Sequence, residues 1–313
     1  MKSLKTIIIE YLNCCQYQKQ LSPKTITAYQ RDLIQYKKYI ENSCHNKKMF
    51  YEKHSLEDYL RYCHSQYQPK TVKRKIASLK AFFKYMIIND IIDKNPWDKI
   101  QYHFKEAFII PKTIPLHIVE ELYTIMYSLK NTSISKFKYM QITRDIAVCE
   151  LLFSTGIRIS ELIGINTSDV DFFTHDILIH GKGSKERIVH VGCNDSFNAI
   201  VDYYTLYSSV ITTSGPFFVN TSGNRISDQS VRRMLQKYAK SLPSSPHITP
   251  HMFRHTFATE LIEADVDIRY IQKMLGHSSI HTTEIYTHVS LAKQREILES
   301  KHPRNNLKII SDR

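Results

Sequence analysis

Apolar residues recur at helical spacing through the first hundred residues. In the segment that starts at Ser22-Pro23, a dipeptide typical of a helix start, the repeating apolar positions are Ile26, Tyr29, Leu33 and Tyr36. A second stripe, over residues 70–88, consists of Ile76, Leu79, Phe82, Phe83 and Met86. The pattern predicts that residues 1 to about 100 form a helical unit.

A break in this pattern predicts a domain boundary. Pro96, Pro111 and Pro115 interrupt the chain, and proline ends helices and marks connecting segments. The sequence therefore predicts an N-terminal domain at 1–103, a linker at 104–115 and a second domain at 116–302. The basic, polar residues 303–313 are expected to form a frayed, flexible tail.

The second domain alternates helical segments with one short pair of strands. The stretch DILIHGKGSKERIVHVG places apolar residues, among them Ile188, on both sides of a Gly-rich turn, which predicts a β-hairpin with Lys182 near its tip. The expected helices lie near 116–130, 141–155, 195–210, 227–241, 250–264, 267–275 and 281–299. The predicted fold class is therefore mainly α with a small β-sheet.

Composition narrows the class of partner. The 313 residues carry a formal net charge of +13, which favours an extended anionic partner, either nucleic acid or a membrane surface. No apolar run approaches the ~20 residues of a membrane span, and the apolar run before Glu10 has only three residues, too few for a signal peptide. The six cysteines show no CxxC spacing and are interpreted as free thiols. We therefore expect a cytoplasmic protein that binds nucleic acid and no membrane.

Basic residues crowd the start of the second N-terminal helix. Cations are disfavoured at a helix N-terminus by the helix dipole, and a polyanion against that end would offset the repulsion. The alternative is a solvated basic face. The candidate DNA contacts are Lys24, Lys70, Lys73, Arg74 and Lys75.

The segment HITPHMFRHTFATELIEAD carries groups suited to a phosphate. Thr249 can cap a helix whose first residue is Pro250, and its buried stripe would be Phe253, Phe257 and Leu261. His251 and Arg254, three residues apart, share a different face. An arginine fork can bond two phosphate oxygens, while an imidazole can add a donor or move a proton.

A second such segment contains a histidine and a tyrosine. Asp267 can cap a short helix that ends at Gly276, so His277 lies in a turn. On one continuous helix, the nine residues to Tyr286 would rotate it by about 900°, onto the opposite face. The break at Gly276 lets the two side chains converge.

Two upstream residues are weak signals on their own. Arg158 follows a Gly-containing turn at the start of a helical segment, and taken alone it reads as a surface arginine paired with Glu161. Lys182 lies in GKG, which is a common tripeptide. Both gain meaning only in combination with the segments above.

Five motifs together resemble the tyrosine recombinases, or phage integrase family: TGIRISEL, HGKGSKER, HMFRHTFAT, LGHSS and TTEIYTHV. The chain looks most like the simple two-domain Xer-like members. The resemblance implies an N-terminal helical bundle, which is a SAM-like core-binding domain, and a mostly helical catalytic domain with a small sheet. The two would close around duplex DNA as a C-shaped clamp.

The resemblance also implies the site residues. The matching catalytic positions are Arg158, Lys182, His251, Arg254, His277 and Tyr286. The alternative to Lys182 is Lys185. The family chemistry would make Tyr286 the nucleophile of a 3′-phosphotyrosyl intermediate and Lys182 the general acid, with no metal or cofactor. His251 would help to take the tyrosine proton, but its division of labour with His277 stays open.

The implied partner is double-stranded DNA with specific recombination sites. Four protomers, either identical or shared with a related recombinase, would exchange strands through a Holliday junction, in Xer-like dimer resolution or in mobile-element integration and excision. The predicted last helix carries Leu291, Ile297 and Leu298. These could dock on a neighbouring protomer or pack on their own domain.

The sequence leaves three other functions open. His247, His251 and His255 recur every four residues, as in a metal-dependent hydrolase, but the HExxH pattern is absent because Met252 stands at the glutamate position. A non-catalytic DNA-binding protein would carry the same positive charge. A type IB topoisomerase would share the tyrosine chemistry without exchanging DNA partners.

Overall fold

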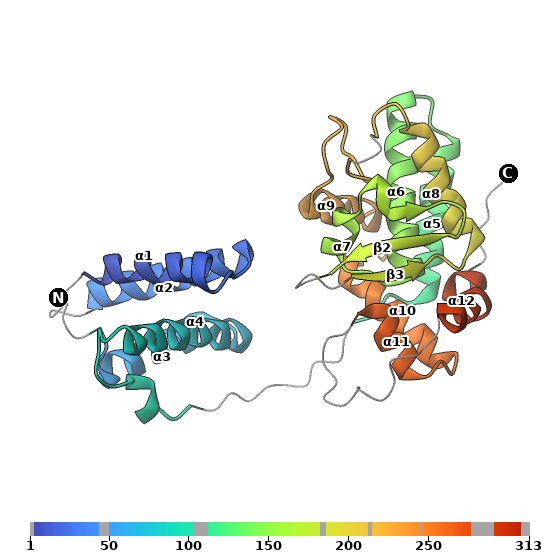
Figure 1. Ribbon diagram of the computed structural model, residues 1–313. Helices are drawn as coiled ribbons and strands as arrows, with labels where there is room; N and C mark the ends of the chain where they lie inside the picture. Colours follow the sequence, from blue (N-terminus) through green and yellow to red (C-terminus); the bar gives the residue numbers. More distant parts are fainter. Residues whose placement is uncertain are drawn as a thin grey trace. The chain divides into compact units, whose positions relative to one another are not determined.

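The chain folds into two units, Met1–Ile109 and Ile110–Arg313. The computed structural model describes residues 3–43, 50–102, 112–181, 186–211, 215–244, 246–276 and 291–307 (Figure 1). Among these residues, no helix is both long and apolar enough to cross a membrane, and the described cysteines are all free thiols.

The first unit is helical, as predicted. Its elements are α1 (Leu4–Asn13), the π-helical turn η1 (Cys14–Gln18), α2 (Pro23–Ser43), α3 (Lys53–Gln66), α4 (Pro69–Ile88) and the 3₁₀ turn η2 (Pro96–Lys99). The predicted stripe of α4 is buried throughout, whereas Ile26 and Tyr29 of α2 are only partly buried. Aromatic rings fill much of this core, and Tyr11 packs edge-on against Phe82 at 5.4 Å.

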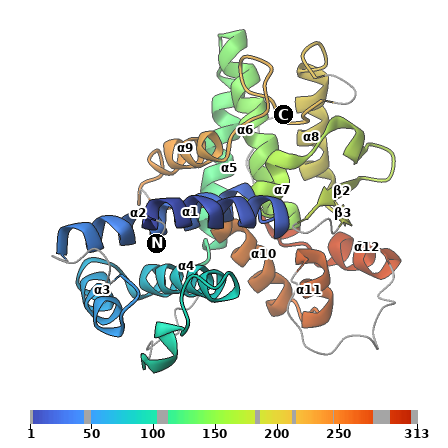
Figure 2. The ribbon, with the colours of Figure 1, turned by 60° about the vertical axis from the view of Figure 1, so that its left-hand side comes forward.

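The second unit is mostly helical, with a small sheet on one side of it (Figures 1 and 2). Its helices are α5 (Leu116–Asn131), α6 (Lys136–Thr155), α7 (Ile159–Gly164), α8 (Asn194–Leu206), α9 (Asp228–Ala239), α10 (Pro250–Glu263), α11 (Ile268–Leu275) and α12 (Leu291–Ser300). Two 3₁₀ turns, η3 (Thr167–Asp169) and η4 (Pro303–Asn306), complete it. Ile114, which precedes α5, is already part of the folded second unit, because its backbone N–H donates to Thr256 Oγ1 at 2.7 Å. The predicted linker therefore extends too far toward α5.

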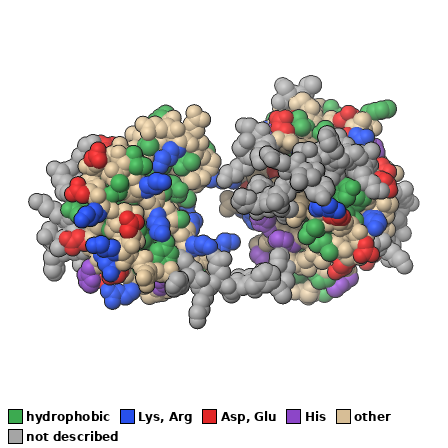
Figure 3. Space-filling model, turned by 60° about the horizontal axis from the view of Figure 1, so that its bottom comes forward, with side chains coloured by type: hydrophobic (Ala, Val, Ile, Leu, Met, Phe, Trp, Pro, Cys, Tyr) green, Lys and Arg blue, Asp and Glu red, His purple; other side chains and the backbone are tan. Residues whose placement is uncertain are grey.

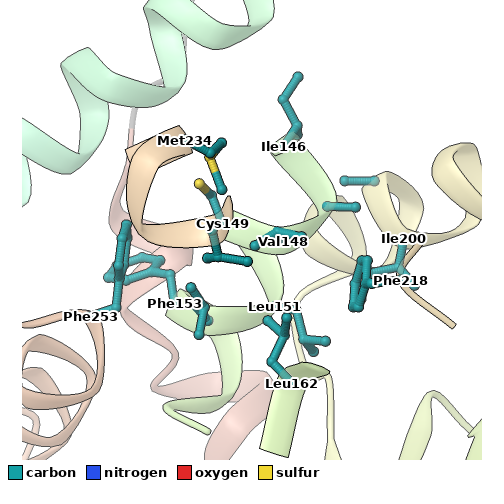
Figure 4. Close-up of a cluster of buried hydrophobic side chains, with 14 of the residues drawn as sticks. Ile146, Val148, Cys149, Leu151, Phe153, Leu162, Ile200, Phe218, Met234 and Phe253 are labelled. Carbon is teal, nitrogen blue, oxygen red and sulfur yellow. The ribbon is translucent and has the colours of Figure 1, made fainter. Parts of the chain in front are cut away.

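Helix α6 forms the centre of the second core. Every residue from Ile142 to Thr155 is buried. Its side chains reach neighbours in several directions, so that Cys149 points toward Met234 of α9 and Phe153 toward Phe253 of α10 (Figure 4). The helix starts five residues earlier than predicted, because the first turns are exposed and show no apolar stripe.

The sheet contains the predicted hairpin and one additional strand. β1 (Val170–Asp171), β2 (Asp176–His180) and β3 (Glu186–His190) are antiparallel in the order β1-β2-β3. Ile177 and Ile179 are buried, as are Val189 and Val191, whereas Ile188 is 42% exposed. The inward-facing residue of this part of β3 is therefore Val189.

The segment after α12 is folded in its described part. Ile297 and Leu298 of α12 pack into a cluster with residues of α10 and α11 in the same chain. The prediction of a frayed tail from Pro303 is wrong for residues 303–307, because Arg304 is buried and forms an ion pair with Glu150 at 3.1 Å. Residues 308–313 lie outside the described residues.

Candidate active site

Half of the predicted catalytic residues lie in the described part of the chain, namely Arg158, His251 and Arg254. The others lie outside the described residues: Lys182, its alternative Lys185, His277 and Tyr286.

Local backbone geometry sets the position of Arg158. Helix α6 ends at Gly156, whose φ of 60° is left-handed and favours glycine. A Cβ at Gly156 would lie 2.6 Å from the Phe257 ring, so the turn packs tightly against α10. Arg158 then caps α7, and its backbone N–H donates to the Glu161 carboxylate at 2.8 Å.

Helix α10 begins as predicted, but it places Arg254 differently. Thr249 caps the helix and Pro250 is its first residue. His251 is exposed, whereas Arg254 is only 5% exposed. The two residues therefore do not share a solvent-facing surface. Arg254 is buried because its guanidinium donates to two backbone carbonyls, Gly156 O at 2.8 Å and Leu275 O at 2.7 Å.

The C-terminus of α11 brings the two arginines together. Asp267 caps the start of this helix, and Gly276 ends it with a left-handed φ of 63°, as predicted. Arg158 donates to Leu275 O at 3.5 Å and to Gly276 O at 3.3 Å, so Leu275 O accepts from both Arg158 and Arg254. The last carbonyls of a helix lack partners within it and form its negative end, which attracts cations.

The site is electropositive. Burial lowers the pKa of Arg254 to about 10, and the positive charge of Arg158 adds to the shift. Arg254 therefore stays charged at neutral pH. The Arg158 side chain remains 37% exposed. Two adjacent guanidinium groups, one of them open to solvent, can bind the non-bridging oxygens of a phosphate.

Arg187, the last residue of the HGKGSKER motif, also belongs to this cluster, although it was not among the candidate site residues predicted from the sequence. It donates to both carboxylate oxygens of Glu161, at 3.0 and 2.8 Å. Burial would raise the pKa of Glu161, but hydrogen bonds from Arg187 and Arg158 outweigh it and bring the pKa down to about 2. Strand alternation could have revealed Arg187, because it shares the inward face of β3 with Val189.

Helix α10 presents two neighbouring histidines. The rings of His251 and His255 are 6.5 Å apart. Burial lowers the pKa of His255, and His251 and Arg254 contribute further. His247 precedes the helix, which starts at Pro250. Within the described residues, no three His, Cys, Asp or Glu side chains are grouped so that they could hold a metal ion.

Two family models match this chain. Residues 120–293 match the model described as phage integrase family, and residues 8–89 match phage integrase, N-terminal SAM-like domain. A tyrosine recombinase of Agathobacter rectalis is 51% identical over 306 residues, which cover 98% of this chain and 99% of the relative. The tyrosine recombinase XerC of Staphylococcus aureus is 34% identical, with coverages of 94% and 95%.

The chain belongs to the phage integrase family.

Solved structures show the same fold as this tyrosine recombinase. A Tn1549 transposon integrase in complex with transposon right end DNA aligns with a TM-score of 0.65 at 20% identity, covering 95% of this chain and 99% of that one. The XerH site-specific recombinase bound to difH substrate aligns with a TM-score of 0.61 at 22% identity, covering 87% and 79%.

The SAM-like domain of this recombinase carries the predicted basic residues, with one correction. Lys24, Lys70, Lys73 and Arg74 are exposed, and Figure 3 shows lysine and arginine side chains interspersed with acidic ones on the visible face of the first unit. Lys75, however, is only 3% exposed. It lies on the buried face of α4, and its Nζ lies 3.2 Å from Asp32 Oδ1.

A groove of about 670 Å³ with several basic residues in its lining lies beside α2 and the start of α4. Its lining includes Gln30, Arg31, Lys38, Tyr67 and Arg74. The sequence analysis missed Arg31 and Lys38, which lie among the polar positions of α2. Helical periodicity could have identified them, since they are seven residues apart and thus share one face.

Proposed function

We propose that this chain is a site-specific recombinase that cuts and rejoins DNA through a covalent bond between Tyr286 and a DNA phosphate. One observation carries the proposal. Arg158 and Arg254, from distant parts of the sequence, converge on the last carbonyls of α11. The chain continues from this point into the predicted His277 and Tyr286. A phosphate held by the arginines would thus lie where the nucleophile's segment begins.

The proposed reaction balances as a transesterification. Tyr286 Oη forms a bond to phosphorus while the bond from phosphorus to the 5′-oxygen breaks. A free tyrosine has a pKa of about 10, so a tyrosine nucleophile needs a base at neutral pH. His251 helps to take its proton, and His277 hydrogen-bonds the phosphate. Lys182, or alternatively Lys185, protonates the leaving 5′-oxygen.

The arginines would stabilise the transition state. They hold the non-bridging oxygens and offset the negative charge that builds up on the pentavalent phosphorus. The 3′-phosphotyrosyl product conserves the energy of the original phosphodiester, so religation needs no ATP. Fixed guanidinium groups supply the positive charge that metal ions supply in many nucleases, and we therefore expect activity without a metal or other cofactor.

The proposed substrate is duplex DNA with specific sites. The exposed Lys24, Lys70, Lys73 and Arg74, together with the groove beside α2, would contact the phosphate backbone and supply salt-dependent affinity. The XerC relative, the XerH complex and the transposon integrase complex suggest two biological roles, dimer resolution and mobile-element integration or excision.

We propose that four protomers, alone or with a related recombinase, assemble on two sites and pass through a Holliday junction. Within the described chain, α12 packs on its own domain through Ile297 and Leu298. If deletion of residues 291–313 left cooperative synapsis unchanged, docking of α12 on a neighbour would be wrong. The proposed location is the cytoplasm, where bacterial DNA lies.

A suicide-substrate assay tests the function. Wild type and Tyr286→Phe are incubated in EDTA with nicked duplexes that carry candidate recombination sites. We expect a covalent protein–DNA band that only wild type forms, together with a free 5′-hydroxyl that polynucleotide kinase can label. A band abolished by EDTA would instead support a metal-dependent hydrolase. Relaxation of supercoiled DNA without any synaptic complex would favour a topoisomerase.

A further inference from the structure

We infer that Arg187 is a positioning residue for the strand-cleavage reaction, acting on Arg158 through Glu161 and on the C-terminus of α11 through a backbone carbonyl. The inference rests on the proposed function. Arg187 is the last residue of the HGKGSKER motif, but it is not one of the six positions that match catalytic residues of the family. Its contacts carry the inference.

Arg187 joins three elements with one side chain. From β3 it reaches Glu161 of α7 with both terminal nitrogens, at 3.0 and 2.8 Å. Its Nε donates to Met274 O of α11 at 3.0 Å. The side chain is only 16% exposed, and that of Glu161 is 5% exposed. Interactions of this kind between buried ions depend on geometry and are costly to break on one side.

Three arginines donate to the backbone carbonyls at the C-terminal end of α11. Arg187 donates to Met274 O, Arg254 donates to Leu275 O, and Arg158 donates to both Leu275 O and Gly276 O. Gly276 allows this approach, because a Cβ there would lie 3.0 Å from Arg187 Nη1. The turn that leads to the predicted His277 is therefore fixed to β3 and to Arg158 at the same time.

Charge gives Arg187 a second role. Glu161 accepts from both Arg158 and Arg187. With Arg254 included, three positive charges and one negative charge leave the cluster at +2. Without Arg187, the cluster falls to +1 and Glu161 pairs with Arg158 alone. Arg158 would then be drawn toward the carboxylate and away from the position in which it meets a phosphate.

The charge count predicts a rescue that a merely structural role would not produce. Arg187→Met should slow single-turnover cleavage by about 10²-fold, as expected for a misplaced catalytic group. Adding Glu161→Gln removes the carboxylate and restores +2, so the double variant should cleave faster than Arg187→Met. Arg187→Lys keeps the charge but cannot make all three hydrogen bonds, and it should fall between wild type and Arg187→Met.

Arg225→Met is the matched control. Arg225 also joins backbone carbonyls, those of Ile163 and Ile165, but it does not contact Glu161. Its loss should change thermal stability without a comparable fall in cleavage rate. Affinity for the intact duplex should stay within about 3-fold of wild type in all variants, because Arg187 faces the protein interior.

The experiment measures formation of the covalent adduct on the nicked duplex that wild type cleaves, with Tyr286→Phe as the negative control and the melting temperature of each variant in parallel. A slow Arg187→Met that Glu161→Gln partly rescues supports the inference. Wild-type rates in Arg187→Met, or a double variant that cleaves no faster than Arg187→Met, overturn it. Absence of the adduct in wild type, or its persistence in Tyr286→Phe, would overturn the proposed function instead.

Discussion

Arg304→Met is expected to destabilise the second unit by about 3–5 kcal/mol, the usual cost of breaking a buried ion pair on one side. Glu150 of α6 is completely buried. It accepts from Arg304 Nη2 at 3.1 Å, from Ser196 Oγ at 2.8 Å and from Tyr127 Oη at 3.1 Å. Methionine can refill part of the volume, but it leaves the carboxylate with two neutral donors only.

A double variant separates lost charge balance from lost packing. Glu150→Gln combined with Arg304→Met removes both charges, and it should recover most of the stability because no buried ion remains unpaired. Arg232→Met is the control. Arg232 pairs with Asp228 on the surface, where the arginine side chain is 43% exposed, and its loss should cost less than about 1 kcal/mol.

Equilibrium unfolding in urea is the assay, with two signals that report on different units. Trp97 is the one tryptophan of the chain, and it lies in the core of the first unit. Its fluorescence should therefore follow that unit and stay unchanged, while circular dichroism should show the second unit unfolding at lower urea. A loss below about 1 kcal/mol, or an equal shift of the Trp97 transition, would refute the reasoning.

Three further predictions concern charge and protonation. Burial lowers the pKa of His302 to about 4, so folding favours the neutral ring. The resulting stability, about 3 kcal/mol, is present above pH 6.5 and lost as the pH falls toward 4. His302→Gln should flatten this part of the stability curve in urea titrations at each pH. Lys24→Ala and Lys70→Ala should each weaken DNA binding uniformly across sequences and reduce the salt slope by about 1 in fluorescence anisotropy. Asp32→Asn should destabilise the first unit by about 3–5 kcal/mol because Lys75 stays buried without a counter-charge, which Trp97 fluorescence would report.

The sequence predicted most helices because their apolar faces and caps are local. Thr249, Asp267 and Gly276 act at the helix ends as predicted. It failed where the signal is not local. The exposed first turns of α6 show no stripe, and strand β1 has only two residues, Val170–Asp171, too few to show an alternation.

The candidate site was predictable only in part for the same reason. Arg158 and Arg254 were identified by motif, but their shared acceptor, Leu275 O, follows from tertiary packing. The ion pair between Arg187 and Glu161 joins residues 26 positions apart, so no periodic pattern in the sequence indicates it. The tail illustrates the opposite error, since a polar and basic composition suggested fraying, whereas Arg304 finds a buried carboxylate 154 positions away.

Peptide mapping of the covalent adduct tests the central claim most directly. Trypsin cleavage after Lys273 and Lys293 releases a peptide whose single tyrosine is Tyr286. After nuclease trimming of an adduct formed in EDTA, mass spectrometry should find this peptide carrying a nucleotide on Tyr286 through a 3′-phosphate. A nucleotide on any other residue, or an unmodified peptide from a verified adduct, would contradict the assignment of Tyr286 as the nucleophile.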